Sequence, residues 1–265
     1  MVHEDIDFSL VDRSAILGVI FYPRKSFYRK PPKPNVTNHL IEVEKGIKIG
    51  CRSYTKGLDC PSFLYFHGNG EIVDDYDFIA PFYNEIGINV FVADYRGYGF
   101  SDGRPTISNM IRDSHQIFKE FSKIVEEYGS RKSLFVMGRS LGSIPAIEVV
   151  YHYQNHVQGL IIESGSANNF RYFFSSLIPP NHPIWSDDSK FLNKVKLRTI
   201  SKPTLIIHAE YDTLVPLEEG KELYHNSAAK DKRFLTIPNA EHNDLMIVGK
   251  KQYFKAIEEF VATYR

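Results

Sequence analysis

The 265-residue sequence is short of several features that would each point to a class of protein. It has no net charge, with 32 basic and 32 acidic residues, so nothing in the balance indicates nucleic acid or an anionic membrane surface as a partner. Its two cysteines, Cys51 and Cys60, form neither a disulfide framework nor a metal-binding pattern. We interpret both as free thiols of a reducing compartment and expect a cytoplasmic protein.

Long apolar runs are also missing. The first apolar run, residues 15–22, has eight residues, which is too short to span a bilayer, and it lacks the features of a secretory signal. What the chain does have is 43% hydrophobic and 24% charged residues, an ordinary balance for a globular protein. At this length, one α/β domain is the natural expectation. We expect an extended N-terminal segment at 1–38, basic and rich in proline, followed by the domain at 39–265.

From residue 39 onward, short apolar runs alternate with amphipathic stretches. The runs predict strands at 39–44, 47–54, 62–66, 89–93, 134–137, 159–162, 204–208 and 233–237. The stretches predict helices at 75–86, 107–128, 141–153, 218–225 and 250–264, and Gly129 is expected to end the second of these. This order predicts a mostly parallel sheet of about eight strands, flanked by helices, with an antiparallel pair at its start.

One segment, at about 164–202, interrupts the alternation and is too long for a plain connection between a helix and a strand. Long insertions of this kind are usually lids or binding loops, so we expect a small cap. The cap is rich in aromatic residues, and four of them are our candidates for substrate binding: Phe170, Phe173, Phe174 and Trp185. The alternative is that these rings only pack the cap onto the core.

The segment Gly138–Gly142 has the pattern G-x-S-x-G and follows the predicted strand 134–137. A tight turn from strand to helix strains the backbone of Ser140 and exposes its hydroxyl, while the glycines make room for the turn. The backbone N–H of Leu141, at the start of the helix, can then donate to an oxyanion. We predict that Ser140 is a nucleophile; the alternative is an ordinary glycine-lined turn with a serine cap.

A serine nucleophile needs a base, and the base needs a group that orients it. Asp212 lies in the loop after strand 204–208, and His242 lies in the loop after strand 233–237. Since ligands bind beyond the carboxyl ends of parallel strands, both are placed to meet Ser140. Three other carboxylates are alternatives for the acid: Glu163, Glu210 and Asp244.

The loop His67–Gly70 follows another predicted strand and reads His-Gly-Asn-Gly. A second amide is needed to hold an oxyanion, and it normally comes from a loop in this place. The backbone N–H of Asn69 is our candidate, and we interpret His67 as structural. His152 and His156 have the four-residue spacing of metal ligands, but no carboxylate lies between them, so we interpret them as a polar helix end and expect no metal or cofactor.

Together these motifs resemble the α/β-hydrolase fold family, and within it the short-cap serine hydrolases of the Bem46 and ABHD17-like group. The likeness runs from about residue 20 to the C-terminus. It is carried by His67–Gly70, Asp94–Ser101, Gly138–Gly142, Asp212 with Val215 and Pro216, and His242–Asp244. The resemblance implies an esterase or a thioesterase. Two positions depart from the group's pattern, since Ala209 and Glu241 stand where glycine is common.

We therefore expect Ser140 to attack the carbonyl of a small-molecule ester or thioester, with His242 as base and Asp212 as its orienting acid. The amides of Asn69 and Leu141 would hold the oxyanion. A cap so short favours short acyl groups of roughly two to six carbons. The alternatives are a small serine peptidase or amidase, and a hydrolase-fold binding protein without turnover. The sequence does not indicate an oligomeric state.

Overall fold

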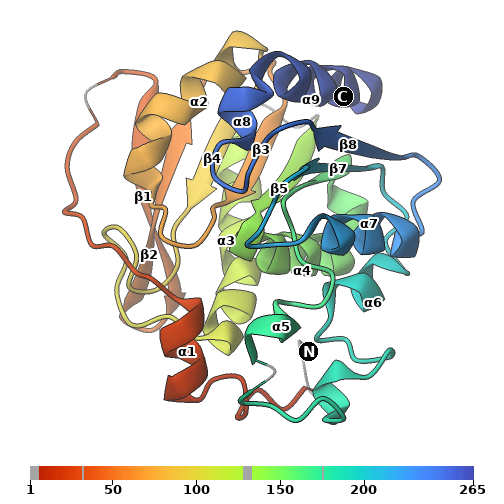
Figure 1. The fold of residues 1–265 in the computed structure, drawn as a ribbon. Coiled ribbons are helices and arrows are strands. Elements are labelled where there is room, and N and C mark those ends of the chain that lie inside the picture. The colour runs from red at the N-terminus through yellow and green to blue at the C-terminus, as the bar shows by residue number, and fades with distance from the viewer. Residues whose placement is uncertain (1–5, 32, 128–132, 175) are drawn as a thin grey trace.

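The computed structural model describes residues 6–31, 33–127, 133–174 and 176–265 (Figure 1). Eight strands form one sheet: β1 (Val36–Glu44), β2 (Ile47–Tyr54), β3 (Ser62–Phe66), β4 (Asn89–Ala93), β5 (Leu134–Arg139), β6 (Gly159–Glu163), β7 (Thr204–Ala209) and β8 (Lys232–Ile237). Their order is β1-β2-β4-β3-β5-β6-β7-β8. The predicted α/β fold with eight strands is thus confirmed.

The sheet is antiparallel only at its first edge, where β1 pairs with β2 and β2 pairs with β4. From β4 to β8 every neighbouring pair is parallel. The carboxyl ends of these six strands therefore lie along one edge of the sheet. The loops that carry the predicted catalytic residues leave this edge.

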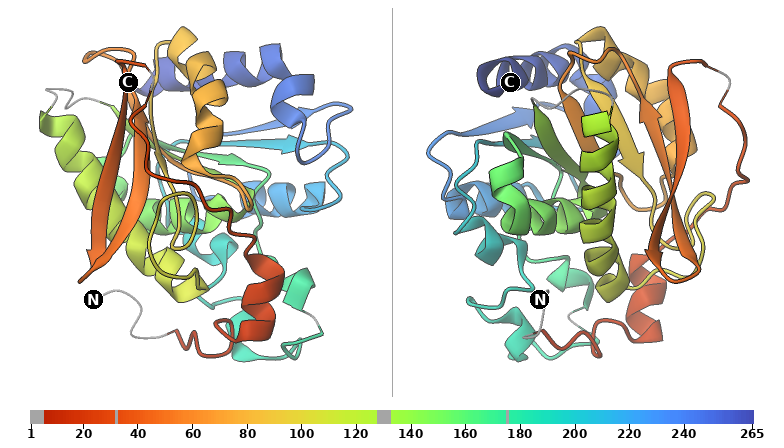
Figure 2. Two further views of the ribbon diagram at one scale, coloured as in Figure 1. Left: turned by 90° about the vertical axis from the view of Figure 1, so that its left-hand side faces the viewer. Right: turned by 180° about the vertical axis from the view of Figure 1, so that it is seen from behind.

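Helices cover both faces of the sheet (Figure 2). One face carries α2 (Tyr76–Glu85), α8 (Leu245–Val248) and α9 (Lys250–Tyr264), and the other carries α3 (Ile107–Glu127), α4 (Ser143–Tyr153), α6 (Asn193–Leu197) and α7 (Leu217–Asn226). The expected helix end at Tyr128 and Gly129 lies outside the described residues. None of the helices in the described ranges has the length and apolar character that crossing a bilayer requires.

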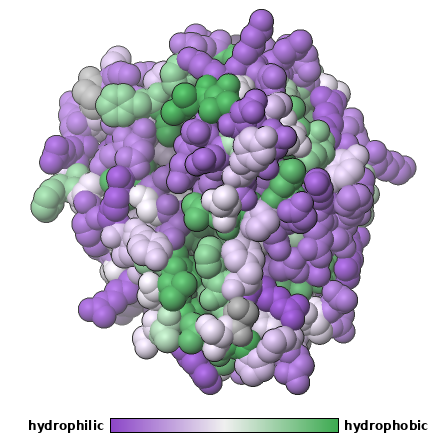
Figure 3. Space-filling view, in the orientation of Figure 1, coloured by the Kyte–Doolittle hydropathy of each residue, from purple (hydrophilic) through white to green (hydrophobic). Residues whose placement is uncertain are grey.

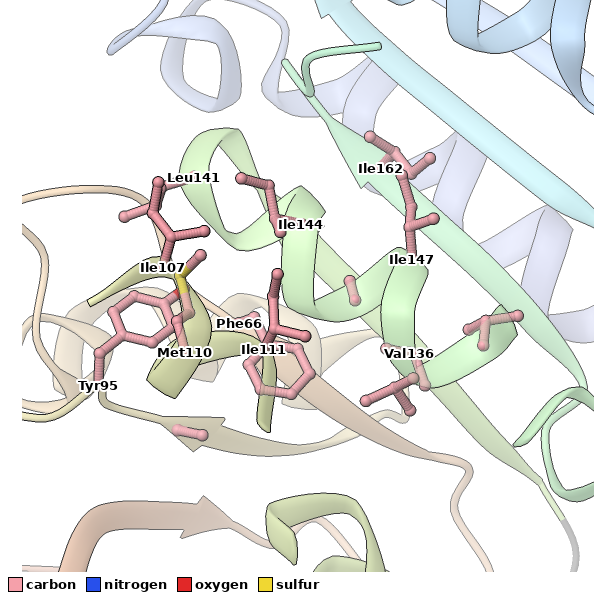
Figure 4. Close-up of a cluster of buried hydrophobic side chains, with 14 of the residues drawn as sticks. Phe66, Tyr95, Ile107, Met110, Ile111, Val136, Leu141, Ile144, Ile147 and Ile162 are labelled. Atoms are coloured by element: carbon pink, nitrogen blue, oxygen red, sulfur yellow. The ribbon is translucent and has the colours of Figure 1, made fainter. Parts of the chain in front are cut away.

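Each face of the sheet buries its own apolar cluster. The cluster under α3 and α4 includes Leu141, which follows the end of β5. In Figure 4, Leu141 and Ile144 lie beside Ile107 and Ile111 of α3, and Ile147 of α4 lies beside Ile162 of β6. The turn that carries the predicted nucleophile is therefore continuous with a packed core, which restricts its motion.

The N-terminal segment departs from the extended chain that we expected, because Ser14–Ile20 forms the helix α1. Ile16 and Ile20, four residues apart, bury their side chains against the core. Seven residues are too few to hold a helix alone, so α1 depends on this packing. The apolar run at 15–22 did not predict this helix, because nothing in its sequence indicates which part of the core it would pack against.

The segment 164–202 contains α5 (Arg171–Phe174), the short 3-10 helix η4 (Pro183–Trp185) and α6, and its residues Phe170 and Phe173 lie beside the turn of Ser140. It has an aromatic core of its own. The rings of Phe174 and Trp185 stack at 6.1 Å between centroids, and Trp185 meets Phe191 edge to face at 5.8 Å. The segment is therefore packed rather than a loose loop.

The fold allows a paired test of core packing. Ile147 is completely buried in α4, whereas Ile247 of α8 is 73% exposed. Ile147→Ala should lower the free energy of unfolding by about 2–5 kcal/mol, since it leaves a cavity in a packed core. Ile247→Ala should change it by no more than about 0.5 kcal/mol. Urea denaturation measures both values, and equal losses would contradict the packing described here.

Candidate active site

Ser140 lies in the turn between β5 and α4, in the 3-10 segment η2 (Ser140–Gly142). Its φ is +50°, a left-handed conformation that is costly for a residue with a side chain. Glycines on both sides make the turn possible. A Cβ on Gly138 would collide with the carbonyl of Gly142, and one on Gly142 would collide with the carbonyl of Phe66. The strain therefore has a specific structural support.

His242 and Asp212 meet Ser140 at the carboxyl edge of the sheet. Nε2 of His242 is 2.9 Å from Oγ of Ser140, and its Nδ1 is 2.7 Å from Oδ2 of Asp212. All three side chains are nearly buried. An imidazole held in this way can accept the hydroxyl proton at Nε2 while Nδ1–H donates to the carboxylate.

Asp212 is held in its ionised form. Its Oδ1 accepts the backbone N–H of Leu214 at 3.1 Å and of Val215 at 2.7 Å. Burial alone would raise the pKa of Asp212, but the hydrogen bond and charge of His242 and the N–H of Val215 outweigh it and lower the pKa. His208, at the end of β7, is buried 3.5 Å from the same carboxylate and bonds to the carbonyl of Val215, so it supports this loop.

The three alternative acids have other partners. Glu163 accepts the hydroxyl of Tyr253 at 2.6 Å, Glu210 accepts the N–H of Asn239, and Asp244 accepts the N–H of Glu241. Of the four carboxylates that the sequence left open, Asp212 is the one bonded to the ring of His242 in the described structure.

Asn69 and Leu141, the two proposed sources of oxyanion N–H groups, both line the pocket in front of Ser140. Within the described residues, neither N–H has a hydrogen-bond partner, so both are available to a ligand. His67, the first residue of the loop that carries Asn69, is completely buried. Its Nε2 is 3.1 Å from Asp94 and its Nδ1 is 2.8 Å from the carbonyl of Gly68. It holds the loop in place, in keeping with a structural role.

Arg139, the residue before Ser140, is a component of the site that the sequence reading missed. Its Nε donates to Glu163 at 3.0 Å, its Nη1 donates to Glu71, and its Nη2 donates to the carbonyl of His242 at 2.9 Å. Glu71 also accepts the N–H of Gly68 at 2.9 Å. One guanidinium thus joins the nucleophile turn, the loop of Asn69 and the loop of His242.

A pocket of about 340 Å³ opens in front of Ser140. Its apolar walls come from four regions of the chain: Val19, Ile20 and Tyr22; Leu141; Phe170 and Phe173; and Leu214 and Val215. Two of our four substrate-binding candidates, Phe170 and Phe173, therefore line it. The other two, Phe174 and Trp185, lie in the aromatic core of the cap and do not line this pocket.

One group of side chains in the described part of the chain has the ligand atoms that a metal ion would need: His115, Glu148 and His152. Both histidines direct Nε2 at the same oxygen of Glu148, at 3.1 and 2.9 Å. The ammonium of Lys196 lies 2.5 Å from the other oxygen and is buried with it. Because a cation already neutralises Glu148, we interpret the group as a buried ion-pair network between helices.

Comparison with known proteins agrees with the resemblance noted in the sequence. The model of the serine aminopeptidase S33 family matches residues 61–179. Protein bem46 of Schizosaccharomyces pombe is 30% identical over 245 residues, which are 88% of this chain and 79% of bem46. Alpha/beta hydrolase domain-containing protein 17B of Homo sapiens is 27% identical over 241 residues, covering 89% of this chain and 78% of that protein.

Solved structures with a similar fold include an esterase from Pyrococcus furiosus. It superposes with a TM-score of 0.73 at 19% identity and covers 91% of this chain and 98% of its own. Est1E from Butyrivibrio proteoclasticus, with ferulic acid bound, gives 0.70 at 20% identity, covering 85% and 98%. At these identities the likeness concerns the fold alone.

The Arg139 contacts lead to a prediction about the reactivity of Ser140. A lysine keeps the positive charge but lacks the planar guanidinium, whose three nitrogens donate to Glu71, Glu163 and the His242 carbonyl at the same time. Arg139→Lys should slow labelling of Ser140 by a fluorophosphonate at least about tenfold in folded protein, equivalent to one lost charge-assisted hydrogen bond.

The matched control is Arg96→Lys. Arg96 makes a similar buried fork with Asp113, at 2.7 and 2.8 Å, and also binds Glu44. This variant should lose stability without slowing the labelling of molecules that remain folded. Equal slowing in both variants would show that Arg139 contributes only general stability.

Proposed function

The chain belongs to the Bem46 and ABHD17-like group of the α/β-hydrolase family, and from that premise we propose that it is a serine hydrolase of carboxylic esters or thioesters. The observation that carries the proposal is the continuous chain of hydrogen bonds from Asp212 through His242 to Ser140, which faces an apolar pocket. Such a chain matches the arrangement in which a serine hydroxyl becomes a nucleophile.

In the proposed reaction, Oγ of Ser140 attacks the substrate carbonyl while Nε2 of His242 takes the hydroxyl proton. Asp212 keeps the proton of Nδ1 in place and stabilises the imidazolium. The C–O or C–S bond then breaks, and the leaving alcohol or thiol receives the proton from His242. Water activated by the same histidine attacks the acyl-enzyme and releases the acid.

The carbonyl oxygen becomes negatively charged in both steps. The N–H groups of Asn69 and Leu141, which lack partners within the described residues, are the proposed donors to it. Both are fixed before the reaction starts. Leu141 is anchored in the core under α4, and the loop of Asn69 is tied through Gly68 and Glu71 to Arg139. Donors held in advance need no reorganisation as charge develops.

The pocket favours an ester or thioester over the amino-terminal peptide bond that the description of the matching family model suggests. An aminopeptidase must hold the free ammonium of its substrate, and a charge taken into a pocket needs an opposite charge. None of the described residues that line this pocket is a carboxylate, and its one cation, Arg139, is paired with Glu71 and Glu163.

Ser140→Ala tests the nucleophile. The variant removes only a hydroxyl and should keep the fold, yet hydrolysis of p-nitrophenyl acetate should fall by about 10⁴ or more. Labelling by a fluorophosphonate should disappear with it. If the variant is labelled as fast as the wild type, another residue is the nucleophile. An unlabelled wild type would favour a binding protein without turnover.

Asp212→Asn tests the acid. An amide at this position no longer favours the imidazole tautomer that carries its proton on Nδ1, so kcat should fall by about 10³ to 10⁴. Glu210→Gln is the control, because Glu210 lies two residues earlier in the same loop and bonds to the N–H of Asn239 instead. The control should stay close to wild type. Wild-type kcat in Asp212→Asn would rule out its proposed role.

A further inference from the structure

Residues 14–26, here called the N-terminal strap, run past the mouth of the active-site pocket. The strap consists of α1 and an extended piece that follows it. Val19, Ile20 and Tyr22 line the pocket on one side. α1 and α5 lie at the same end of the molecule in Figures 1 and 2, so the strap and the cap enclose the pocket from different parts of the chain.

The strap is fastened to the loop that holds the proposed oxyanion donor. The side chain of Asn69 donates to the carbonyl of Ile20 at 2.5 Å and accepts the N–H of Tyr22 at 3.0 Å. The hydroxyl of Tyr98 donates to the same Asn69 oxygen at 2.6 Å. Asn69 thus offers its backbone N–H to the pocket while its side chain fixes the strap.

The same attachment continues along the extended piece. The N–H of Gly99 donates to the carbonyl of Arg24 at 2.8 Å, and the N–H of Ser26 donates to the carbonyl of Gly99 at 2.9 Å. Arg24 also pairs with Asp75 at 2.5 Å. A segment with so many bonds holds a definite position, so its side chains form a wall of fixed shape.

The facing wall is fixed as well. Phe170 has a φ of +61°, which is strained for a bulky side chain. Its N–H donates to Oγ of Ser166 at 2.9 Å. The preceding Asn169, also at positive φ, bonds through its side chain to the carbonyl of Phe191 and to the N–H of Asn193. The structure thus maintains a strained conformation at a ring that lines the pocket.

The rim of the pocket is apolar and open to solvent. Four of its lining residues are large hydrophobic side chains that are at least 40% exposed: Val19, Tyr22, Phe173 and Leu214. In Figure 3 apolar groups gather in the lower centre of this face, over α1 and beside α5. An apolar patch concentrated around a pocket is suited to an apolar ligand.

We propose that the N-terminal strap is the chain-length wall of the acyl pocket, with Val19 as the residue that limits the acyl group. The inference rests on the proposed hydrolase function. A volume of about 340 Å³ is near the small end of the ~300–1,000 Å³ typical of ligand pockets. With the leaving group at the open rim, an acyl group of roughly two to six carbons is the size that this space accommodates.

The test is a series of p-nitrophenyl esters from acetyl to dodecanoyl. In the wild type, kcat/KM should rise by up to about fourfold per carbon while methylenes still enter the pocket, and then fall beyond roughly six carbons. In Val19→Trp the indole ring, much larger than the valine side chain, occupies part of the pocket. The ratio of kcat/KM for hexanoyl to that for acetyl should therefore drop at least tenfold. Val19→Ala should move the maximum to longer chains.

Ala15→Trp is the matched control, since Ala15 is exposed one turn earlier in α1 and does not line the pocket. It should leave the hexanoyl-to-acetyl ratio unchanged. The proposal is wrong if Val19→Trp and Ala15→Trp behave alike, or if the wild type prefers twelve carbons or more.

A second measurement separates this inference from the proposed function. In a Ser140→Ala background, titration with hexanoic acid, the product of the proposed reaction, measures binding of the acyl group without turnover, whichever residue is the nucleophile. Adding Val19→Trp should weaken binding at least tenfold, while adding Ala15→Trp should not. Unchanged binding overturns the strap as a wall even if the wild type hydrolyses esters. A selective loss supports it even if Ser140 proves not to be the nucleophile.

Discussion

The loops around Ser140 are organised around one largely buried cation, Arg139. A guanidinium taken out of water is costly unless carboxylates neutralise it and its N–H groups find acceptors. Glu71 and Glu163 meet that requirement for Arg139: burial alone would lower its pKa, and their charges raise it. Glu71 lies beyond the end of β3, Glu163 ends β6, and the third partner is the backbone carbonyl of His242 in the loop after β8. The need to satisfy one charge thus brings the loops around Ser140 together.

The site residues that could be predicted from the sequence are those whose positions follow from the residues next to them in the chain. The turn at Ser140 needs glycines at fixed offsets, and Asp212 and His242 follow strands whose carboxyl ends must meet at one edge. The sequence favours Asp212 as the acid but keeps Glu163 as an alternative, because both follow buried strands. Contacts across the sheet support Asp212, since it bonds to His242 while Glu163 is bound to Arg139 and Tyr253.

The strap and the cap aromatics show what remained beyond sequence reading. α1 is too short to signal a helix by periodicity, and its place depends on bonds to Asn69, whose side chain is more than forty residues away. Among the cap rings, composition could not distinguish Phe170, turned toward the pocket by a left-handed backbone, from Phe174, which stacks on Trp185. Backbone conformation separates them, and no pattern of apolar residues encodes it.

The attachment of the strap through the side chain of Asn69 has a consequence for divergence among related enzymes. In the proposed function, the reacting groups and the strap that limits the acyl chain lie in separate stretches of the chain, and the side chain of Asn69 connects them. Residues 19–22 can therefore change without any change to Ser140, His242 or Asp212. Asn69 itself lacks that freedom, because any replacement alters the selective wall and a loop of the reaction centre at once.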